Sequence, residues 1–96
     1  MDELKKQLVP LLKQSHVEFA GIFGSVARGE ATPTSDIDLL VRFSKPIGLF
    51  ELVGVQQNLS EQLKKPVDLV TEASLCRHIR DRVLNDLVVL YGKQIG

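Results

Sequence analysis

Two aspartates, Asp36 and Asp38, stand one residue apart and lead directly into the apolar run IDLLVRF. In a β-strand, residues i and i+2 project from the same face, so these two side chains point together if the strand begins here. Two ionised carboxylates held side by side repel each other, and one of them tends to take up a proton. A divalent cation removes this conflict, and carboxylate oxygens suit magnesium, which also binds substrate phosphates. The pair therefore predicts a magnesium site at the mouth of a strand.

A third acid, Asp68, lies in the middle of the short apolar segment PVDLV. A carboxylate in such a strand needs a partner. If this strand lies beside IDLLV, Asp68 can point to the same side as the first two acids. Three carboxylates could hold two magnesium ions, which clamp an in-line displacement at phosphorus by stabilising both the attacking and the leaving oxygen.

A glycine-serine pair, Gly24 and Ser25, precedes the acids by about a dozen residues. Glycine lets the backbone approach a phosphate closely, and a turn that enters a helix offers free N–H groups and the positive end of a dipole. The Ser25 hydroxyl can donate to a phosphate oxygen, and Arg28 can add charge-assisted hydrogen bonds. The spacing matches neither a Walker loop nor a dinucleotide-binding fingerprint.

Each of these residues also has a purely structural explanation. Ser35 and Asp38 satisfy the S-x-x-D pattern of a helix cap. Asp68 can be a satisfied acid at a strand bend, Gly24 an ordinary turn glycine, and Arg28 a solvated or ion-paired side chain. The ordered occurrence of all three motifs favours the metal and phosphate site.

The elements that must position these residues follow from hydrophobic periodicity. Leucines at helical spacing predict an amphipathic helix over residues 2–15, with Pro10 as a kink. The segments VEFAGIF, IDLLVRF and PVDLV predict strands, and a short helical turn is expected over VAR. Helices are expected over residues 48–64 and over CRHIRDRVLNDL, whereas VVLYG either extends the last helix or forms a strand. This order predicts a small mixed sheet with helices packed against it.

Core positions in the two later helices also follow from helical spacing. They are Leu49, Phe50, Val53, Leu59 and Leu63 in the first, and Ile79, Val83 and Leu87 in the second.

Several isolated residues have no expected part in the chemistry. His16 and His78 are expected at the surface or at helix ends, and Cys76 as a small buried or half-buried residue. Tyr91 could accept a transferred group, although packing of the C-terminal segment explains it better.

The bulk properties describe an ordinary globular chain. It has 96 residues, 44% apolar and 25% charged, which predicts a single domain over residues 1–96. Twelve basic residues balance twelve acidic ones, which argues against a dedicated nucleic-acid surface. The single cysteine excludes an intramolecular disulfide and fits a reducing compartment. Without an apolar signal segment or a membrane span, the chain is expected to be cytoplasmic.

The stretch GSVARGEATPTSDIDLLVRF resembles the signature of the polymerase-beta-type nucleotidyltransferase superfamily. Together with PVDLV and RHIRDRVLNDLVVLYG, it is similar to the minimal nucleotidyltransferases, the MNT antitoxins of HEPN/MNT pairs, over residues 17–92. The resemblance implies an α+β small nucleotidyltransferase fold, with a mixed sheet flanked by three to four helices.

The same resemblance implies a function. Such proteins bind ATP with magnesium and transfer AMP to a hydroxyl, in characterised pairs a tyrosine of the HEPN toxin. By similarity, Gly24 and Ser25 bind the triphosphate, Asp36 and Asp38 bind metal, and Asp68 completes the metal site and helps to activate the hydroxyl. Because the chain lacks a second domain to grip an acceptor, acceptor recognition falls to a partner protein, in a homo- or hetero-oligomer.

Two other functions stay open at this level. The first is an antitoxin that neutralises its partner by direct binding, without catalysis. The second is transfer to a small-molecule hydroxyl, which the lack of a second domain disfavours.

Overall fold

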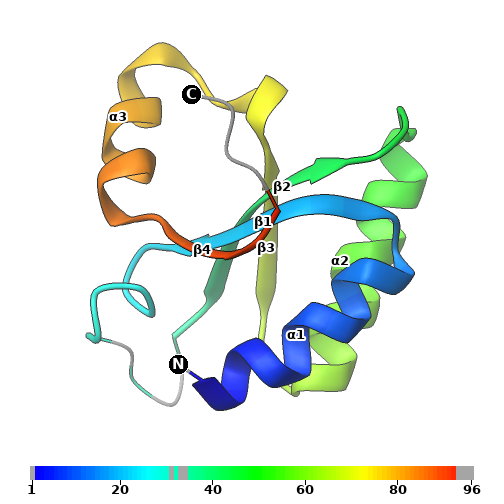
Figure 1. The fold of residues 1–96 in the computed structure, drawn as a ribbon, viewed down its shortest axis with the longest axis horizontal. Helices are drawn as coiled ribbons and strands as arrows, with labels where there is room; N and C mark the ends of the chain where they lie inside the picture. Colours follow the sequence, from blue (N-terminus) through cyan, green and yellow to red (C-terminus); the bar gives the residue numbers. More distant parts are fainter. Residues whose placement is uncertain (1, 31, 33–34, 93–96) are drawn as a thin grey trace.

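The computed structural model describes residues 2–30, 32 and 35–92, which form an α+β fold around one mixed sheet (Figure 1). The elements follow the order α1 (Asp2–Gln14), β1 (Val17–Phe23), β2 (Ile37–Phe43), α2 (Leu49–Leu63), β3 (Val67–Thr71), a 3₁₀ turn η1 (Glu72–Ser74), α3 (Arg77–Asp86) and β4 (Val88–Tyr91). The three predicted strands and three predicted helices are all present. The segment VVLYG, for which two outcomes were open, forms the fourth strand.

The sheet has the strand order β3-β2-β1-β4. β1 is antiparallel to both β2 and β4, whereas β2 and β3 are parallel. A parallel pair requires a crossover connection, and α2 provides it between β2 and β3. The parallel pairing matters for the site, because the first residues of β2 and β3 meet at the same end of the sheet.

Helices cover the two faces of the sheet unequally (Figure 1). α1 and α2 pack on one face, where the larger cluster includes Leu12 of α1, Leu59 of α2 and Leu39 of β2. α3 packs on the other face, where Val83 joins Phe19 and Leu40 in a smaller cluster. The alternation of Leu39 and Leu40 between these clusters is the period-2 pattern of a strand buried on both faces.

The predicted core of α2 is wrong at three positions. Leu49 is 73% exposed, Phe50 94% and Val53 41%. The inner stripe of α2 instead contains Leu59, which is fully buried, with Leu52, Val55 and Leu63 packed against the core. Phe50 and Val53 belong to the neighbouring stripe, which continues into the exposed Gln57.

Expectations about four single residues and one short segment can also be compared with the structure. Ile79 of α3 is 51% exposed and Cys76 is exposed, so both were wrongly expected to be buried. Both histidines are exposed, as predicted. The segment VAR forms hydrogen-bonded turns without a helix, because only the Arg28 N–H reaches back four residues, to the Gly24 carbonyl at 3.1 Å.

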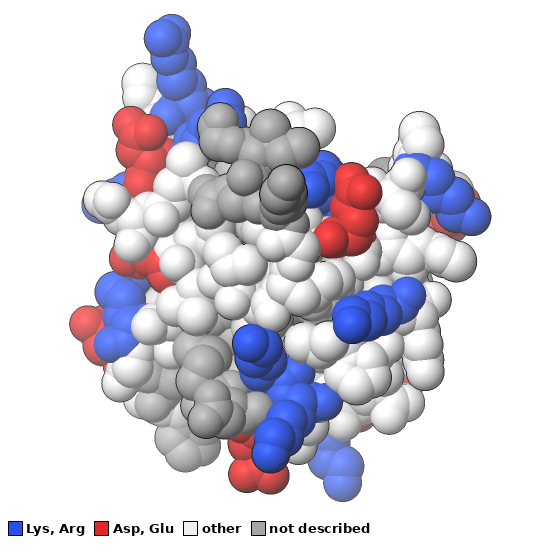
Figure 2. All heavy atoms as spheres, in the orientation of Figure 1, with Lys and Arg blue, Asp and Glu red and all other residues white. Residues whose placement is uncertain are grey.

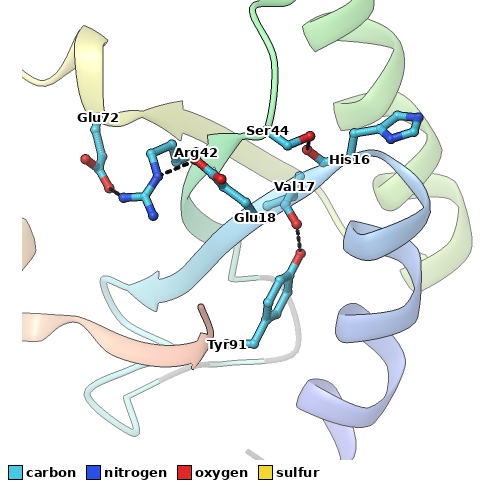
Figure 3. Close-up of polar contacts among 7 residues, drawn as sticks. All are labelled: His16, Val17, Glu18, Arg42, Ser44, Glu72 and Tyr91. Carbon is cyan, nitrogen blue, oxygen red and sulfur yellow. Dashed lines mark hydrogen bonds and ion pairs between the residues drawn. The ribbon is translucent and has the colours of Figure 1, made fainter. Parts of the chain in front are cut away.

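Polar contacts tie the sheet together at the end away from the acids (Figure 3). The guanidinium of Arg42 lies between the carboxylates of Glu18 and Glu72, at 2.8 and 3.3 Å. The Tyr91 hydroxyl donates to the carbonyl of Val17 at 2.5 Å and thus joins the last strand to the first. Tyr91 therefore has the packing role expected for it.

No helix in the described part of the chain is both long and apolar enough to cross a membrane.

Candidate active site

The strand register brings the predicted acids Asp38 and Asp68 next to each other. β2 and β3 are parallel, and Asp38 pairs with Asp68 along the ladder. Paired residues of neighbouring strands point to the same face of a sheet, so the two carboxylates share one face. On the other side of β2, Asp38 pairs with Phe23, the last residue of β1. Asp38 thus lies centrally, between the end of β1 and the beginning of β3.

Asp36 lies one residue before β2 and is exposed, like Asp68, whereas Asp38 is half-buried. The pKa of Asp38 is raised above its ordinary value, chiefly because burial disfavours the charged form. The negative charges of Asp68 and then of Asp36 add to this rise, and the positive charge of Arg28 opposes it. Asp36 and Asp68 therefore lie close enough to Asp38 for their charges to act on it. The helix-cap explanation of Ser35 and Asp38 is excluded, because Asp38 lies within β2 and no helix begins there.

The acids supply the donor atoms that the implied magnesium needs, although they are not closely grouped. In the described part of the chain, no three His, Cys, Asp or Glu side chains are grouped closely enough to form a ready metal centre. The donor chemistry does fit, because all three acids supply the hard oxygen ligands that magnesium prefers. The mutual repulsion at Asp38 is also what a bound cation would relieve. Asp36, Asp38 and Asp68 are therefore the residues that would hold the metal.

Gly24 follows β1 and contacts the Asp38 carboxylate. It has φ +79°, the left-handed region that favours glycine, and a Cβ placed there would collide with Oδ2 of Asp38. The next residue, Ser25, accepts the Glu30 N–H on its backbone carbonyl at 2.9 Å. Within the described residues its hydroxyl makes no hydrogen bond, so it is available to a ligand. The glycine-serine turn and the acids thus meet at one end of the sheet.

Arg28, the third predicted phosphate ligand, is held by two carboxylates. Its guanidinium lies 2.6 Å from Oδ2 of Asp86 at the end of α3 and 3.2 Å from Oε2 of Glu30. Hydrogen bonds to Asp86, and to a lesser extent to Glu30, raise the pKa of Arg28 above its ordinary value. The side chain remains partly exposed and connects the turn to α3.

A cavity of about 530 Å³ lies between the glycine-serine turn and α3. Its lining comes from two segments, with Phe23, Gly24 and Arg28 on one side and Ile79, Arg82, Val83, Asn85 and Asp86 of α3 on the other. Sequence reasoning missed the α3 residues, although the i, i+3, i+4, i+7 spacing of residues 79, 82, 83 and 86 places them on one helix face.

The face of the molecule shown in Figure 2 carries charges of both signs. Basic and acidic side chains are interspersed over the face shown in Figure 2, in keeping with twelve of each in the sequence. Such a surface does not attract long polyanions strongly.

A glycine-serine turn beside acids from two parallel strands is an arrangement suited to transfer of a nucleotidyl group. Residues 1–90 match the family model described as nucleotidyltransferase domain. The chain belongs to this family and is a nucleotidyltransferase, as the sequence predicted.

Similar proteins are found in two archaea. MJ0435 of Methanocaldococcus jannaschii, provisionally named a protein adenylyltransferase, is 42% identical over 88 residues, which are 92% of this chain and 95% of that protein. The protein adenylyltransferase MntA of Thermococcus cleftensis is 34% identical over 92 residues, covering 92% of this chain and 93% of MntA. A crystal structure described as a toxin–antitoxin with AMP-PNP is 25% identical with a TM-score of 0.83, covering 94% of this chain and 74% of that one.

Proposed function

We propose that this nucleotidyltransferase is a magnesium-dependent protein adenylyltransferase, which moves AMP from ATP to a tyrosine hydroxyl of a HEPN toxin and so acts as its antitoxin. The observation that carries this proposal is the register of Asp38 with Asp68, beside a glycine-serine turn that contacts Asp38. Support also comes from relatives named as protein adenylyltransferases and from the similar toxin–antitoxin structure with AMP-PNP, an ATP analogue.

In the proposed reaction, the hydroxyl oxygen of the partner attacks the α-phosphorus of ATP. A new P–O bond forms, the bond to the oxygen that bridges the α- and β-phosphates breaks, and pyrophosphate leaves. Asp68 accepts the hydroxyl proton, because it is exposed on β3, at an edge of the sheet that a partner can reach. Magnesium, when bound to the acids, supplies the positive charge that offsets that of the triphosphate.

The glycine-serine turn has a binding role in this proposal. The Ser25 hydroxyl donates to a phosphate oxygen, and Gly24 lets the backbone lie against both the phosphates and Asp38. These two residues would therefore orient the triphosphate toward the acids.

The direct test incubates the protein with ATP labelled at the α-phosphate, magnesium and the purified partner toxin. Labelled AMP should appear on the toxin with the wild type, and should fall at least a hundredfold with the Asp36→Asn/Asp38→Asn variant. Asp81→Asn is the matched control, because Asp81 is exposed on α3 and lies outside the site. Equal labelling by the wild type and the double variant would refute the proposal, and tyrosine-to-phenylalanine variants of the toxin would identify the acceptor.

An antitoxin that acts by binding alone is the second candidate. It is favoured by the exposed apolar side chains of Leu49, Phe50 and Val53 at the beginning of α2, since such patches mark interaction surfaces. Rescue of toxicity separates the two candidates. At equal expression, full rescue by Asp36→Asn/Asp38→Asn would favour binding, and failed rescue with retained binding would favour the enzyme.

A further inference from the structure

β3, the strand that carries Asp68, forms one edge of the sheet, so half of its backbone groups face away from β2. Such groups of an edge strand are ordinarily left to water or to a second chain. Here two of them are bonded to side chains of α2. The N–H of Val67 donates to the Ser60 hydroxyl at 3.0 Å, and the N–H of Leu69 donates to Oε1 of Gln56 at 2.9 Å. These two bonds flank Asp68 along the chain.

Gln56 and Ser60 suit this edge because the spacing of the helix matches that of the strand. Residues four apart lie on one face of a helix, about 6 Å apart along its axis. The two N–H groups are two residues apart in a strand, which is about 6.6 Å. The later helix residue bonds to the earlier strand residue, as expected where a helix turns back directly into the next strand.

Ser60 also ties the beginning of β3 to the last turn of α2. Its hydroxyl donates to the carbonyl of Gln56 at 2.9 Å while it accepts the Val67 N–H. Its own carbonyl accepts the N–H groups of Lys64 and Lys65, the latter at 3.3 Å. Lys64 has φ 56°, in the left-handed region, so the chain leaves the helix in a tight turn. The position at which β3 begins is therefore fixed from α2.

The backbone of Asp68 is held on both sides as a result. On one side Asp68 pairs with Asp38 of β2. On the other side its neighbours Val67 and Leu69 are bonded to α2, and their side chains are buried, at 4% and 7% exposed. Asp68 itself is exposed on the opposite face of the strand. The direction in which its carboxylate points thus depends on a segment that α2 holds in place.

We infer that Gln56 and Ser60 are positioning residues for Asp68, which hold β3 so that the carboxylate stays beside Asp38 and faces the acceptor hydroxyl. The inference rests on the proposed function, in which Asp68 accepts the hydroxyl proton, and it adds two residues that lie outside the sequence motifs. Both act through Asp68 from the far side of the strand. A misplaced proton acceptor slows the chemical step, so their loss should lower kcat more than it raises KM for ATP.

The test measures kcat and KM for ATP in labelling of the toxin, well below the Tm of each variant. Gln56→Met keeps the side-chain length but removes the acceptor, and should lower kcat roughly ten- to a hundredfold with KM within about twofold. Gln56→Glu keeps an acceptor oxygen at the same chain length and should restore most of the lost rate. Ser60→Ala and Ser60→Thr form the equivalent pair for the hydroxyl. Gln57→Met is the matched control, because Gln57 is exposed beside Gln56 on α2, and it should label like the wild type.

Two further measurements distinguish positioning from a general loss of stability. Amide hydrogen exchange followed by NMR should show the Leu69 amide of Gln56→Met exchanging at least about tenfold faster, while the amides of the central strand β1 keep their protection. In the Asp68→Asn background, Gln56→Met should cause no further loss of rate, because it acts through Asp68. If Asp68→Asn abolishes labelling altogether, rescue by Gln56→Glu decides instead.

The outcomes separate this inference from the proposed function. Faster exchange at Leu69 with an unchanged kcat would overturn the inference, and so would losses that add in the Asp68→Asn background or a failed rescue by Gln56→Glu. If Asp68→Asn labels like the wild type, the inference falls, while the proposed transfer then rests on Asp36 and Asp38. If the wild type itself does not label the toxin, the proposed function and this inference fall together.

Discussion

At the scale of single residues, Gly24 has a backbone conformation that favours glycine and also lies against the carboxylate of Asp38. Its left-handed φ disfavours any side chain, and the collision of a Cβ with Asp38 adds a second reason for glycine. The chain offers a natural comparison in Gly29, which has φ +75° and no atom within 4 Å of the point where a Cβ would lie. The two glycines thus differ only in what lies beside them.

Gly24→Ala should therefore damage the site more than the fold. The left-handed conformation costs about 1–2 kcal/mol for alanine at either glycine, so both variants should lose similar stability. Only Gly24→Ala displaces the Asp38 carboxylate, and a displacement of about 1 Å can lower a rate roughly a hundredfold. Labelling of the toxin together with chemical denaturation checks both effects. Equal activity of the two variants would show that Asp38 tolerates the change.

Asp38 should be a residue that serves function at the expense of stability. Burial and the charges of Asp68 and Asp36 raise its pKa, which means that the ionised form is disfavoured in the folded protein. Asp38→Asn removes this charge, so at neutral pH and without metal the Tm should stay equal or rise while activity is lost. Asp81→Asn serves as the comparison, and a clear fall in Tm for Asp38→Asn alone would contradict the electrostatic account.

The motif residues were predictable because their placement depends on local rules. Period-2 alternation was enough to expect Asp38 and Asp68 on one face if their strands are neighbours, and the register has them paired. The cavity could not be predicted in this way. Its far wall is α3, and which face of α3 meets the turn depends on packing between segments that are more than fifty residues apart in sequence, such as Arg28 and Asp86.

At the scale of elements, α2 shows that helical spacing identifies apolar stripes on a helix but does not say which stripe faces the sheet. Leu52, Val55, Leu59 and Leu63 recur at three- and four-residue intervals, and so do Phe50 and Val53. Both stripes look apolar in sequence, but only the first faces the sheet. The helix was therefore predictable from the sequence. Its buried face depends on how α2 packs against the sheet between β2 and β3, which the spacing alone does not show.

Substitutions on the two stripes of α2 should change the stability of the fold to very different extents. Leu59→Ala removes a fully buried side chain from the larger cluster and should lower the free energy of unfolding by about 2–5 kcal/mol. Phe50→Ala removes a side chain that is 94% exposed and should change it by less than about 0.5 kcal/mol. Urea denaturation measures both, and a large loss for Phe50→Ala would mean that this face is covered in solution.

At the scale of the whole molecule, the last strand of the chain pairs with the first and forms one edge of the sheet. β4 pairs with β1, and the Tyr91 hydroxyl donates to the carbonyl of Val17, the first residue of β1 (Figure 3). A backbone carbonyl can accept this bond only while the phenol keeps its proton. The contact that joins the last strand to the first is therefore sensitive to alkaline pH.

Alkaline unfolding should reveal this contact. Burial raises the pKa of Tyr91 to about 12, above the value of about 10 for an unperturbed tyrosine. Because the folded state holds the proton more tightly, this contribution to stability is complete below about pH 10 and is lost as pH rises toward about 12. Tyr91→Phe cannot ionise, so its Tm should be lower at neutral pH but should fall less steeply than that of the wild type between about pH 10 and 12. The two proteins differ by this one hydroxyl, so parallel Tm curves would show that Tyr91 is not the group responsible.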